Sequence, residues 1–405
     1  MPFANPQPDV RALDAFVTLC GKRAWTARMS DLGARAQAGS LSGRGMQQRH
    51  ALELALARLS RGQCGARLSL AERRVCAFAQ EAVRLAATLP AGPRARLREQ
   101  LLAGLSGEAT LIPLFHLLRV AAMQRARGFE VRFTGLAEGT PHDLEIRQGD
   151  AMAQVAAETV SADEGRHLHR GDWYALVDRV NPDLQTWLAA HPGRYLLKMT
   201  LPEGLNGADQ LSGLHQRITE MLAAEKRQDS GAQAVLKLDP LVLAGAQAAD
   251  PGAPGGLPAR LRAQFGPEAH LALTTDPSSG SVFVMAARAG RENEIAEAVC
   301  RRLALAAESR LDGGKVPGIL ATFLDDLDRA EWRALRDRLE LEGSVRRFLT
   351  TGAARGVVAV SCASRFELFG ASPPDGVAEG ELRFRNPSHP QAKNPALASA
   401  VLSSV

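Results

Sequence analysis

Two carboxylates stand where they could support metal-dependent chemistry. Asp143 follows Pro141 and His142 at the start of one expected strand, and Glu158 lies near the end of the next. Carboxylates supply the hard oxygen ligands that Mg²⁺ or Mn²⁺ prefers. Acids on neighbouring strands can converge on one ion, and that ion can activate water for phosphodiester hydrolysis. Asp143 and Glu158 are therefore the candidate catalytic and metal-binding residues.

The elements that must position this pair are predicted from apolar spacing. A helix with one apolar face precedes Asp143 and ends at Gly128, as a C-cap would. Alternating residues then predict three short strands around a turn, followed by a further helix. The predicted ranges are helix 111–125, strand 129–133, turn 135–140, strands 142–147 and 151–160, and helix 165–180.

This order of elements resembles the PD-(D/E)xK nuclease superfamily. Pro141, Asp143, the acidic position in the third strand and the continuation from Thr159 to Arg166 carry the resemblance. It implies a restriction-endonuclease-like fold, in which a mixed sheet is flanked by helices. It also implies a site in which two acids hold Mg²⁺ or Mn²⁺. In the family, a lysine two positions after the second acid faces the same side of the strand and acts on the attacking water.

The family's triad is incomplete in either register of the third strand. In the preferred register, Ala156 replaces the second acid and Glu158 replaces the lysine, and residues 159–166 continue in step. In the other register, Glu158 is the acid and Val160 occupies the lysine position. In both cases Asp143 and Glu158 remain as two carboxylates, with Gln154 or a nearby histidine as a potential helper.

Three functional hypotheses follow from this incomplete triad. The favoured one is a nucleic-acid-associated protein with a nuclease-like fold that has lost catalysis. The second is a non-enzymatic interaction or assembly scaffold, for which the match is a chance feature of an unrelated α/β fold. The third is a variant endonuclease that uses Mg²⁺ or Mn²⁺ at Asp143 and Glu158.

Charge is unevenly distributed along the chain. Residues 1–128 contain 19 basic and 8 acidic side chains, whereas the remainder contains 30 basic and 36 acidic ones. A basic module joined to a mildly acidic one suggests an anionic partner, and nucleic acid is the commonest candidate. The alternatives are a solvated Arg-rich surface, or a basic face that docks on the acidic part of the same chain.

Several basic side chains are candidates for phosphate contacts. Arg94, Arg96 and Arg98 fall at an expected helix start, and Arg166 and Arg170 flank the pair His167 and His169. The histidine pair is interpreted as part of an exposed basic loop. A further group of acids, Asp325, Asp326 and Asp328, resembles a metal cluster, but loop acids and a helix N-cap are the commoner cause.

The predicted organisation is an all-helical basic region followed by an α/β domain. We expect helices over residues 1–108, an α/β nuclease-like domain over 109–370 and a loose C-terminal tail over 371–405. A Gly/Pro-rich stretch at 244–258 marks a potential break inside the α/β domain. Strands that alternate with helices are the basis for the α/β class.

Other function classes lack their signatures. The five cysteines are scattered and include no CxxC pair, which argues against a disulfide framework or a thiolate zinc site and favours a cytoplasmic location. No apolar run is long enough to span a membrane, and no secretory signal is expected. The phosphate-binding, dinucleotide-binding and nucleophile-elbow motifs are also absent.

Overall fold

The computed structural model places the chain in two compact units. The described residues are 10–37, 39–63, 68–205, 207–241, 260–261, 264–266, 268–364 and 381–403. The first unit comprises Met1–Arg35, Met46–Glu164 and Ala296–Val405, and the second comprises Ala36–Gly45 and Gly165–Ile295. The boundary therefore does not fall at residue 108, because the N-terminal helices and a mixed sheet share the first unit. The potential break at 244–258 lies outside the described residues.

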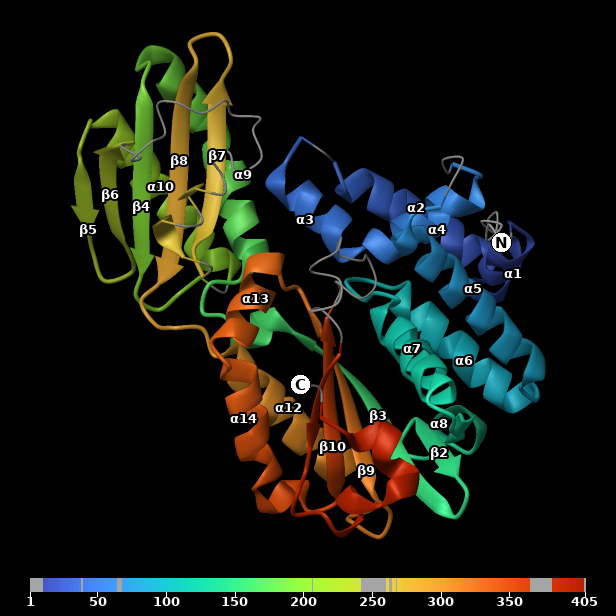
Figure 1. The fold of residues 1–405 in the computed structure, drawn as a ribbon. Helices are drawn as coiled ribbons and strands as arrows, with labels where there is room; N and C mark the ends of the chain where they lie inside the picture. The colour runs from blue at the N-terminus through green and yellow to red at the C-terminus, as the bar shows by residue number, and fades with distance from the viewer. Residues whose placement is uncertain are drawn as a thin grey trace, which may run out of the picture. The chain divides into compact units, whose positions relative to one another are not determined.

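The N-terminal region is helical, as its periodicity predicts (Figure 1). Its helices are α1 (Val10–Cys20), α2 (Lys22–Arg35), α3 (Leu41–Arg49), α4 (Ala51–Ser60), α5 (Leu70–Thr88), α6 (Ala91–Gly104) and α7 (Ile112–Ala126). Ser69 starts α5 with a capping box to Glu72. A chain of aromatic contacts, edge-on between Phe16 and Phe78 and tilted between Phe78 and Phe115, joins α1, α5 and α7 in one core.

The sheet of the first unit has six strands in the order β1-β2-β3-β9-β10-β11. They are β1 (Glu130–Arg132), β2 (Leu144–Gln148), β3 (Ala151–Ser161), β9 (Gly318–Asp325), β10 (Val357–Ser364) and β11 (Leu382–Arg385). The first three strands pair antiparallel, β3, β9 and β10 run parallel, and β11 returns antiparallel. Of the parallel strands, β9 and β10 are almost wholly buried, as expected for strands covered on both faces, whereas β3 is only partly buried.

Helices cover this sheet on both sides. Figure 1 shows α7 on one side and α12 (Ile295–Arg310) on the other. The short helices α8 (Thr134–Ala137) and η1 (Ala162–Gly165) precede β2 and follow β3. Between β9 and β10 lie α13 (Arg329–Asp337), α14 (Glu340–Leu349) and η3 (Gly352–Ala354). The crossover from β9 to β10 thus returns the chain for parallel pairing.

The expectation of a loose C-terminal tail is wrong for residues 381–403. This segment contributes β11 to the sheet and continues as η4 (Pro390–Lys393), η5 (Pro395–Leu397) and α17 (Ala398–Val401). Phe384, Leu397 and Val401 are buried. Small and apolar residues in the tail fill space against β10, and its proline and glycine content concealed this packing.

The second unit holds a separate mixed sheet of five strands in the order β5-β6-β4-β8-β7. They are β4 (Arg194–Leu201), β5 (Gln228–Ser230), β6 (Val235–Pro240), β7 (His270–Asp276) and β8 (Ser281–Ala289). Helices α9 (Arg170–Ala190) and α10 (Ala208–Ala223) pack with it around a core that includes Trp173, Leu184 and Phe283. The helix predicted over 165–180 is the first part of the longer helix α9, which continues to Ala190 with Pro182 inside it.

Two broader expectations can be compared with the described residues. No helix in the described part of the chain is long and apolar enough to span a membrane. Cys20, Cys76, Cys300 and Cys362 are free thiols. The predicted α/β class is confirmed, with the helices concentrated in the N-terminal region.

The acid Asp328 is the N-cap of α13, as predicted. Its side chain accepts the Glu331 N–H at 2.9 Å, and the Glu331 carboxylate accepts the Asp328 N–H at 2.8 Å. Replacing Asp328 with alanine removes one of these reciprocal bonds and should lower the free energy of unfolding by about 1 kcal/mol. Urea denaturation followed by circular dichroism would measure this loss, and an Asp328→Ser variant, which retains an N-cap acceptor, should recover most of it.

Candidate functional site

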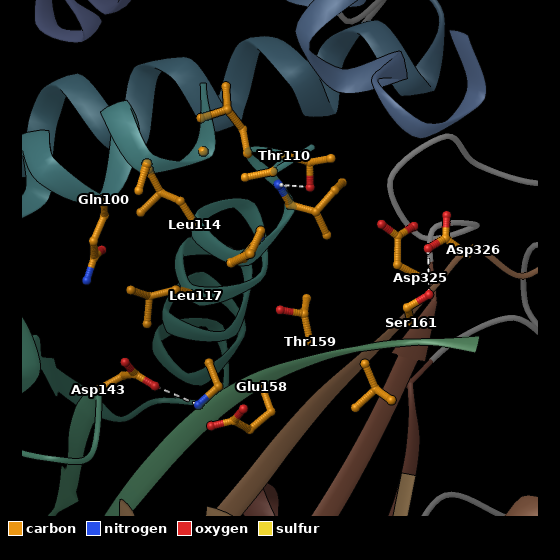
Figure 2. A pocket seen from close by; sticks show the side chains of 18 of the residues that line it. Gln100, Thr110, Leu114, Leu117, Asp143, Glu158, Thr159, Ser161, Asp325 and Asp326 are labelled. Atoms are coloured by element: carbon orange, nitrogen blue, oxygen red, sulfur yellow. Dashed lines mark hydrogen bonds between the residues drawn. The ribbon is translucent and has the colours of Figure 1, made fainter. Parts of the chain in front are cut away.

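Asp143 is held at the point where β2 separates from β3. The last paired residues of these strands are Leu144 and Val155. The Asp143 N–H donates to the Val155 carbonyl at 3.0 Å, and the Ala157 N–H donates to the Asp143 carboxylate at 2.7 Å. Figure 2 shows the second of these bonds. Beyond the last paired residues, the Asp143 carboxylate thus accepts the Ala157 N–H in place of a backbone carbonyl of β2. This bond fixes the carboxylate against β3.

Glu158 directly follows Ala157 on β3, and its carboxylate meets that of Asp143 through a third residue, Arg310. Arg310 is the last residue of α12. Its Nη2 donates to the Asp143 carboxylate at 2.7 Å, its Nη1 donates to the Glu158 carboxylate, and its Nε donates to the Pro141 carbonyl at 2.7 Å. A planar guanidinium is suited to such multiple recognition. The two predicted site carboxylates are thus joined by one cation from the protein itself.

The electrostatics of Asp143 reflect two opposed effects. Burial raises the pKa of Asp143 above its ordinary value, and the nearby Glu158 acts in the same direction. The Arg310 guanidinium and the Ala157 N–H lower the pKa in opposition. The charge of ionised Asp143 is poorly solvated, and the positive charge of Arg310 offsets this cost of burial.

The residues present do not fit the expected Mg²⁺ or Mn²⁺ site. The Arg310 guanidinium already occupies the space between the two carboxylates that would be ligands. At the preferred position of the second acid, Ala156 is fully buried. Gln154, the potential helper, pairs with Asp312 through both ends of its amide. Across the described ranges, no group of three or more His, Cys, Asp or Glu side chains could hold a metal ion.

A cavity of about 630 Å³ opens beside this ion pair, within the first unit. One wall is the end of β3 from Ala157 to Ser161, and the facing wall is the start of α7 with Leu114 and Leu117 (Figure 2). The charged side chains that line it are Arg49, Asp143, Glu158, Glu164, Arg310, Asp325 and Asp326. Carboxylates thus outnumber guanidinium groups among the lining residues, five to two.

The acids Asp325 and Asp326 lie at the far end of this cavity. Asp326 accepts a hydrogen bond from the Ser161 hydroxyl at 2.7 Å and pairs with Arg49 at 3.3 Å. Its backbone has a φ of 57°, the left-handed conformation that Asp tolerates better than most residues. Asp326 is a loop residue directly after β9, as the sequence interpretation expected, whereas Asp325 is the last residue of the strand itself.

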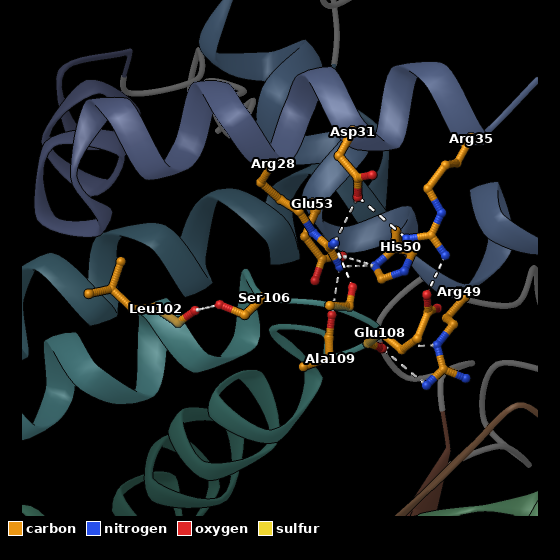
Figure 3. A network of polar contacts seen from close by, with 11 residues as sticks. Arg28, Asp31, Arg35, Arg49, His50, Glu53, Leu102, Ser106, Glu108 and Ala109 are labelled. Atoms are coloured by element: carbon orange, nitrogen blue, oxygen red, sulfur yellow. Dashed lines mark hydrogen bonds and ion pairs between the residues drawn. The ribbon is translucent and has the colours of Figure 1, made fainter.

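A partly buried polar network (Figure 3) holds the loop 107–111, which contributes Ala109, Thr110 and Leu111 to the lining of the cavity. Arg28 of α2 donates to the carbonyls of Gly107 and Ala109 at 2.7 and 2.8 Å. Arg49 donates to the Glu108 carbonyl at 3.2 Å. Glu53 of α4 accepts the N–H of Leu111, the residue before α7, at 2.6 Å. The position of this cavity wall is therefore set by side chains of the N-terminal helices.

His50 and Glu53 are the titratable residues at the centre of the network, and both are fully buried. Burial raises the pKa of Glu53 to about 7, against the opposing effects of the Leu111 N–H and Arg28. Burial and the positive charge of Arg28 lower the pKa of His50 to about 4. Both groups are thus neutral in the folded protein over much of the mildly acidic range.

The three arginines of α6 differ in their surroundings. Arg96 donates to the carbonyls of Leu136 and Ala137 at 2.7 and 2.8 Å, so it fastens α6 to α8. Arg94 and Arg98 are exposed, although Arg94 also donates to the Leu89 carbonyl at 2.9 Å. Arg94 and Arg98 remain available to an anionic partner, whereas Arg96 has a structural role.

The second predicted basic group belongs to the other unit. Arg166 is only 4% exposed, which does not fit the expected surface contact with phosphates. Arg170 begins α9 and is half-buried. His169 precedes α9 and lies 3.7 Å from the Asp172 carboxylate, and His167 is half-buried rather than part of an exposed loop. These residues form a local structure at the start of the second unit.

Sequence reasoning missed Arg310, Arg28, His50 and Glu53. Glu53 carried a signal, because it precedes the buried Leu56 and Ala57 by three and four positions and so shares their helix face. Arg310 carried none, since an arginine at the end of an amphipathic helix is ordinary. No family model, curated protein or solved structure matches this chain.

Proposed function

We propose that this chain is a nucleic-acid-associated protein with a restriction-endonuclease-like fold whose hydrolytic centre has been replaced by an ion pair. The observation that carries the proposal is the guanidinium of Arg310 between Asp143 and Glu158. In this interpretation, the protein's own cation satisfies the two carboxylates that a nuclease would use for a metal ion. The loss of the acid at Ala156 and of a lysine nearby points the same way.

The arrangement of the first unit supports the fold part of the proposal. Helix α7 precedes the antiparallel strands β1, β2 and β3, and α12 leads into β9, which pairs parallel with β3. The stretch from α7 to β3 follows the order of elements on which the sequence resemblance rests, whereas the helix predicted over 165–180 is α9 of the second unit. The carboxylate of Asp143 lies at the divergence of two strands, where ligands from both could meet.

The nucleic-acid part rests on charge. The first 128 residues have a surplus of eleven positive charges. Arg94 and Arg98 are exposed on α6, and Lys22 and Arg23 are exposed at the start of α2. The Arg98 guanidinium reaches the α1–α2 turn at Gly21, so these basic side chains belong to one neighbourhood. Such a cluster attracts phosphates without reading sequence.

Cleavage and binding assays on one preparation test this function. We expect no cleavage of plasmid, single-stranded DNA or RNA with Mg²⁺ or Mn²⁺, and a mobility shift at low salt. The double variant Arg94→Gln/Arg98→Gln should bind more weakly. Each lost phosphate contact lowers the slope of log affinity against log salt by roughly 0.9, so the slope should fall by about 2.

The matched control is Arg346→Gln/Arg347→Gln on α14, which also removes two exposed arginines from the first unit. It should leave the salt slope unchanged. Metal-dependent cutting that disappears in Asp143→Ala would show that Asp143 and Glu158 still work as a nuclease. Failure to bind any nucleic acid at low salt would refute the binding part of the proposal.

A further inference from the structure

The strand β3 has an open edge inside the cavity. Its pairing with β2 ends at Val155, whereas its pairing with β9 continues from Gln154 to Ser161. Among the described residues, no strand pairs with the other side of β3 beyond Val155. Edges of this kind can accept an additional strand.

Backbone groups of this edge face the cavity. The Ala157 N–H points toward Asp143, and the N–H and C=O groups of alternate residues point to the same side of a strand. The Ala157 carbonyl and the N–H and carbonyl of Thr159 therefore face the same way. The Ser161 N–H, next in the alternation, is directed at the Glu164 carboxylate at 3.4 Å. The N–H and C=O of Thr159 therefore face the cavity between the Ala157 N–H, which donates to Asp143, and the Ser161 N–H, which is directed at Glu164.

The charge of the cavity identifies the chemistry of an occupant. Five of the seven charged lining residues are acidic, and they lie at both ends of the exposed edge. One end already binds a guanidinium, that of Arg310, and the other binds that of Arg49. A surplus of negative charge attracts cationic groups and repels phosphates. The volume, about 630 Å³, lies within the roughly 300–1,000 Å³ typical of ligand sites.

We propose that this cavity binds an extended peptide segment of a partner protein that carries lysine or arginine side chains and adds a strand to β3 at Thr159. Main-chain hydrogen bonds would provide affinity, and the acids at the two ends would select basic side chains at alternate positions. A free amine or polyamine would satisfy the carboxylates but leave the Thr159 backbone unused. This site goes beyond the nucleic-acid interface proposed above, because its charge has the opposite sign.

Selection from a random hexapeptide library tests the proposal directly. The purified full chain is immobilised and incubated with N-acetylated, C-amidated hexapeptides, and the bound fraction is sequenced. We expect lysine and arginine to be enriched at alternate positions and aspartate and glutamate to be depleted. A selected peptide is then made in two versions, which are N-methylated at the odd-numbered or at the even-numbered amides. The version that methylates the amides facing β3 should bind about tenfold more weakly, because their backbone hydrogen bonds are lost. The version that methylates the amides facing away from β3 should bind as tightly as the unmethylated peptide.

Two protein variants locate the binding. Glu164→Lys reverses an exposed charge of the cavity, and Glu138→Lys is its matched control, since both carboxylates are about half exposed and paired with one arginine. Only Glu164→Lys should weaken binding, by about tenfold. Thr159→Pro removes the edge N–H, a change that edge strands tolerate, and should weaken binding by about fivefold. Its melting curve checks that it folds.

The outcomes separate this site from the nucleic-acid interface. Arg94→Gln/Arg98→Gln should leave peptide binding intact, and Glu164→Lys should leave nucleic-acid binding no weaker. A bound fraction with the composition of the input library would overturn the proposal. Binding that is equally sensitive to Glu138→Lys, or insensitive to N-methylation in both versions of the peptide, would also overturn it. Each of these results is independent of whether the protein binds or cuts nucleic acid.

Discussion

Replacing Arg310 with alanine should lower the free energy of unfolding by about 2 kcal/mol near neutral pH. Removing one partner of a buried ion pair typically costs 3–5 kcal/mol, and partial exposure reduces that cost. Here the Asp143 and Glu158 side chains are 17% and 16% exposed, and that of Arg310 is 27% exposed. The loss arises because the variant leaves two carboxylates that repel each other without a cation.

The pH dependence of this loss has a definite sign. Burial already raises the pKa of Asp143, and removal of Arg310 raises it further. A group whose pKa is higher in the folded state contributes stability at low pH and loses it as pH rises through the folded pKa. Urea denaturation of Arg310→Ala should therefore show a deficit that grows as the pH is raised.

Divalent metal should reverse the deficit, because the vacated space lies between two oxygen ligands. Ligand binding to the folded state at about a hundredfold excess over Kd adds about 2.7 kcal/mol. We expect Mn²⁺ to stabilise Arg310→Ala but not the unmodified chain, and Arg310→Ala/Asp143→Asn to lose the response. Calorimetry or denaturation with titrated Mn²⁺ would measure it.

Arg347→Ala is the control for Arg310→Ala. Arg347 pairs with Glu297 in the same unit, but the two side chains are 74% and 49% exposed. Its loss should cost under about 1 kcal/mol and give no response to Mn²⁺. If Arg310→Ala were as stable as the unmodified chain at all pH values and indifferent to Mn²⁺, the guanidinium would not be replacing a metal ion.

The largest change in pH dependence is expected from Glu53→Gln. The pKa of Glu53 is raised from 4.5 to about 7 in the folded protein, so its contribution to stability falls as pH rises between these values. Since one pKa unit corresponds to 1.36 kcal/mol, the stability of Glu53→Gln relative to the unmodified chain should rise by roughly 3 kcal/mol across this range.

His50 gives stability a pH dependence of the opposite sign and of similar size to that of Glu53. Its pKa is lowered from 6.5 to about 4, so its contribution to stability is present above pH 6.5 and is lost as the pH falls. In the unmodified chain the two dependences largely cancel, because folding in effect moves a proton from His50 to Glu53. Relative to that chain, His50→Gln should lose stability as pH rises from 4 to 6.5.

Urea denaturation at a series of pH values measures both variants against the unmodified chain. Other titrating groups, such as the buried His116, are common to all three proteins and disappear from the difference. A difference for Glu53→Gln that is constant from pH 4.5 to 7 would contradict a neutral buried carboxyl at position 53. If the stability difference from the unmodified chain changed with pH in the same direction for both variants, the opposite pKa shifts of Glu53 and His50 would be contradicted.

Much of the fold could be predicted because burial has a local period. The strand predicted over 151–160 is β3 within one residue, and the helix predicted over 111–125 is α7 within one residue. Strand β7 was missed, because its buried face carries His270, Ala272 and Thr274 rather than large apolar residues, and its pairing with β8 is what stabilises it. Strand β11 was missed because it follows a segment rich in proline and glycine.

The candidate site was predicted only in part, since it is assembled from distant segments. Asp143 and Glu158 were identified because their strands are neighbours in the chain, and their carboxylates do meet one cation. That cation is the guanidinium of Arg310, which lies 167 positions after Asp143. The second unit lies between them in the chain, so no local pattern could join Arg310 to the pair.

The sequence by itself determined the α/β class, the helical N-terminal region and the two carboxylates, because residue spacing along one helix or strand depends only on backbone geometry. The tertiary structure alone decided that these carboxylates share Arg310, that no described strand pairs with the edge of β3 at Thr159, and that Glu53 is buried. These properties depend on which side chains the folded chain brings within hydrogen-bond distance and which of them it removes from water. Both arise from contacts between segments that are far apart in the sequence.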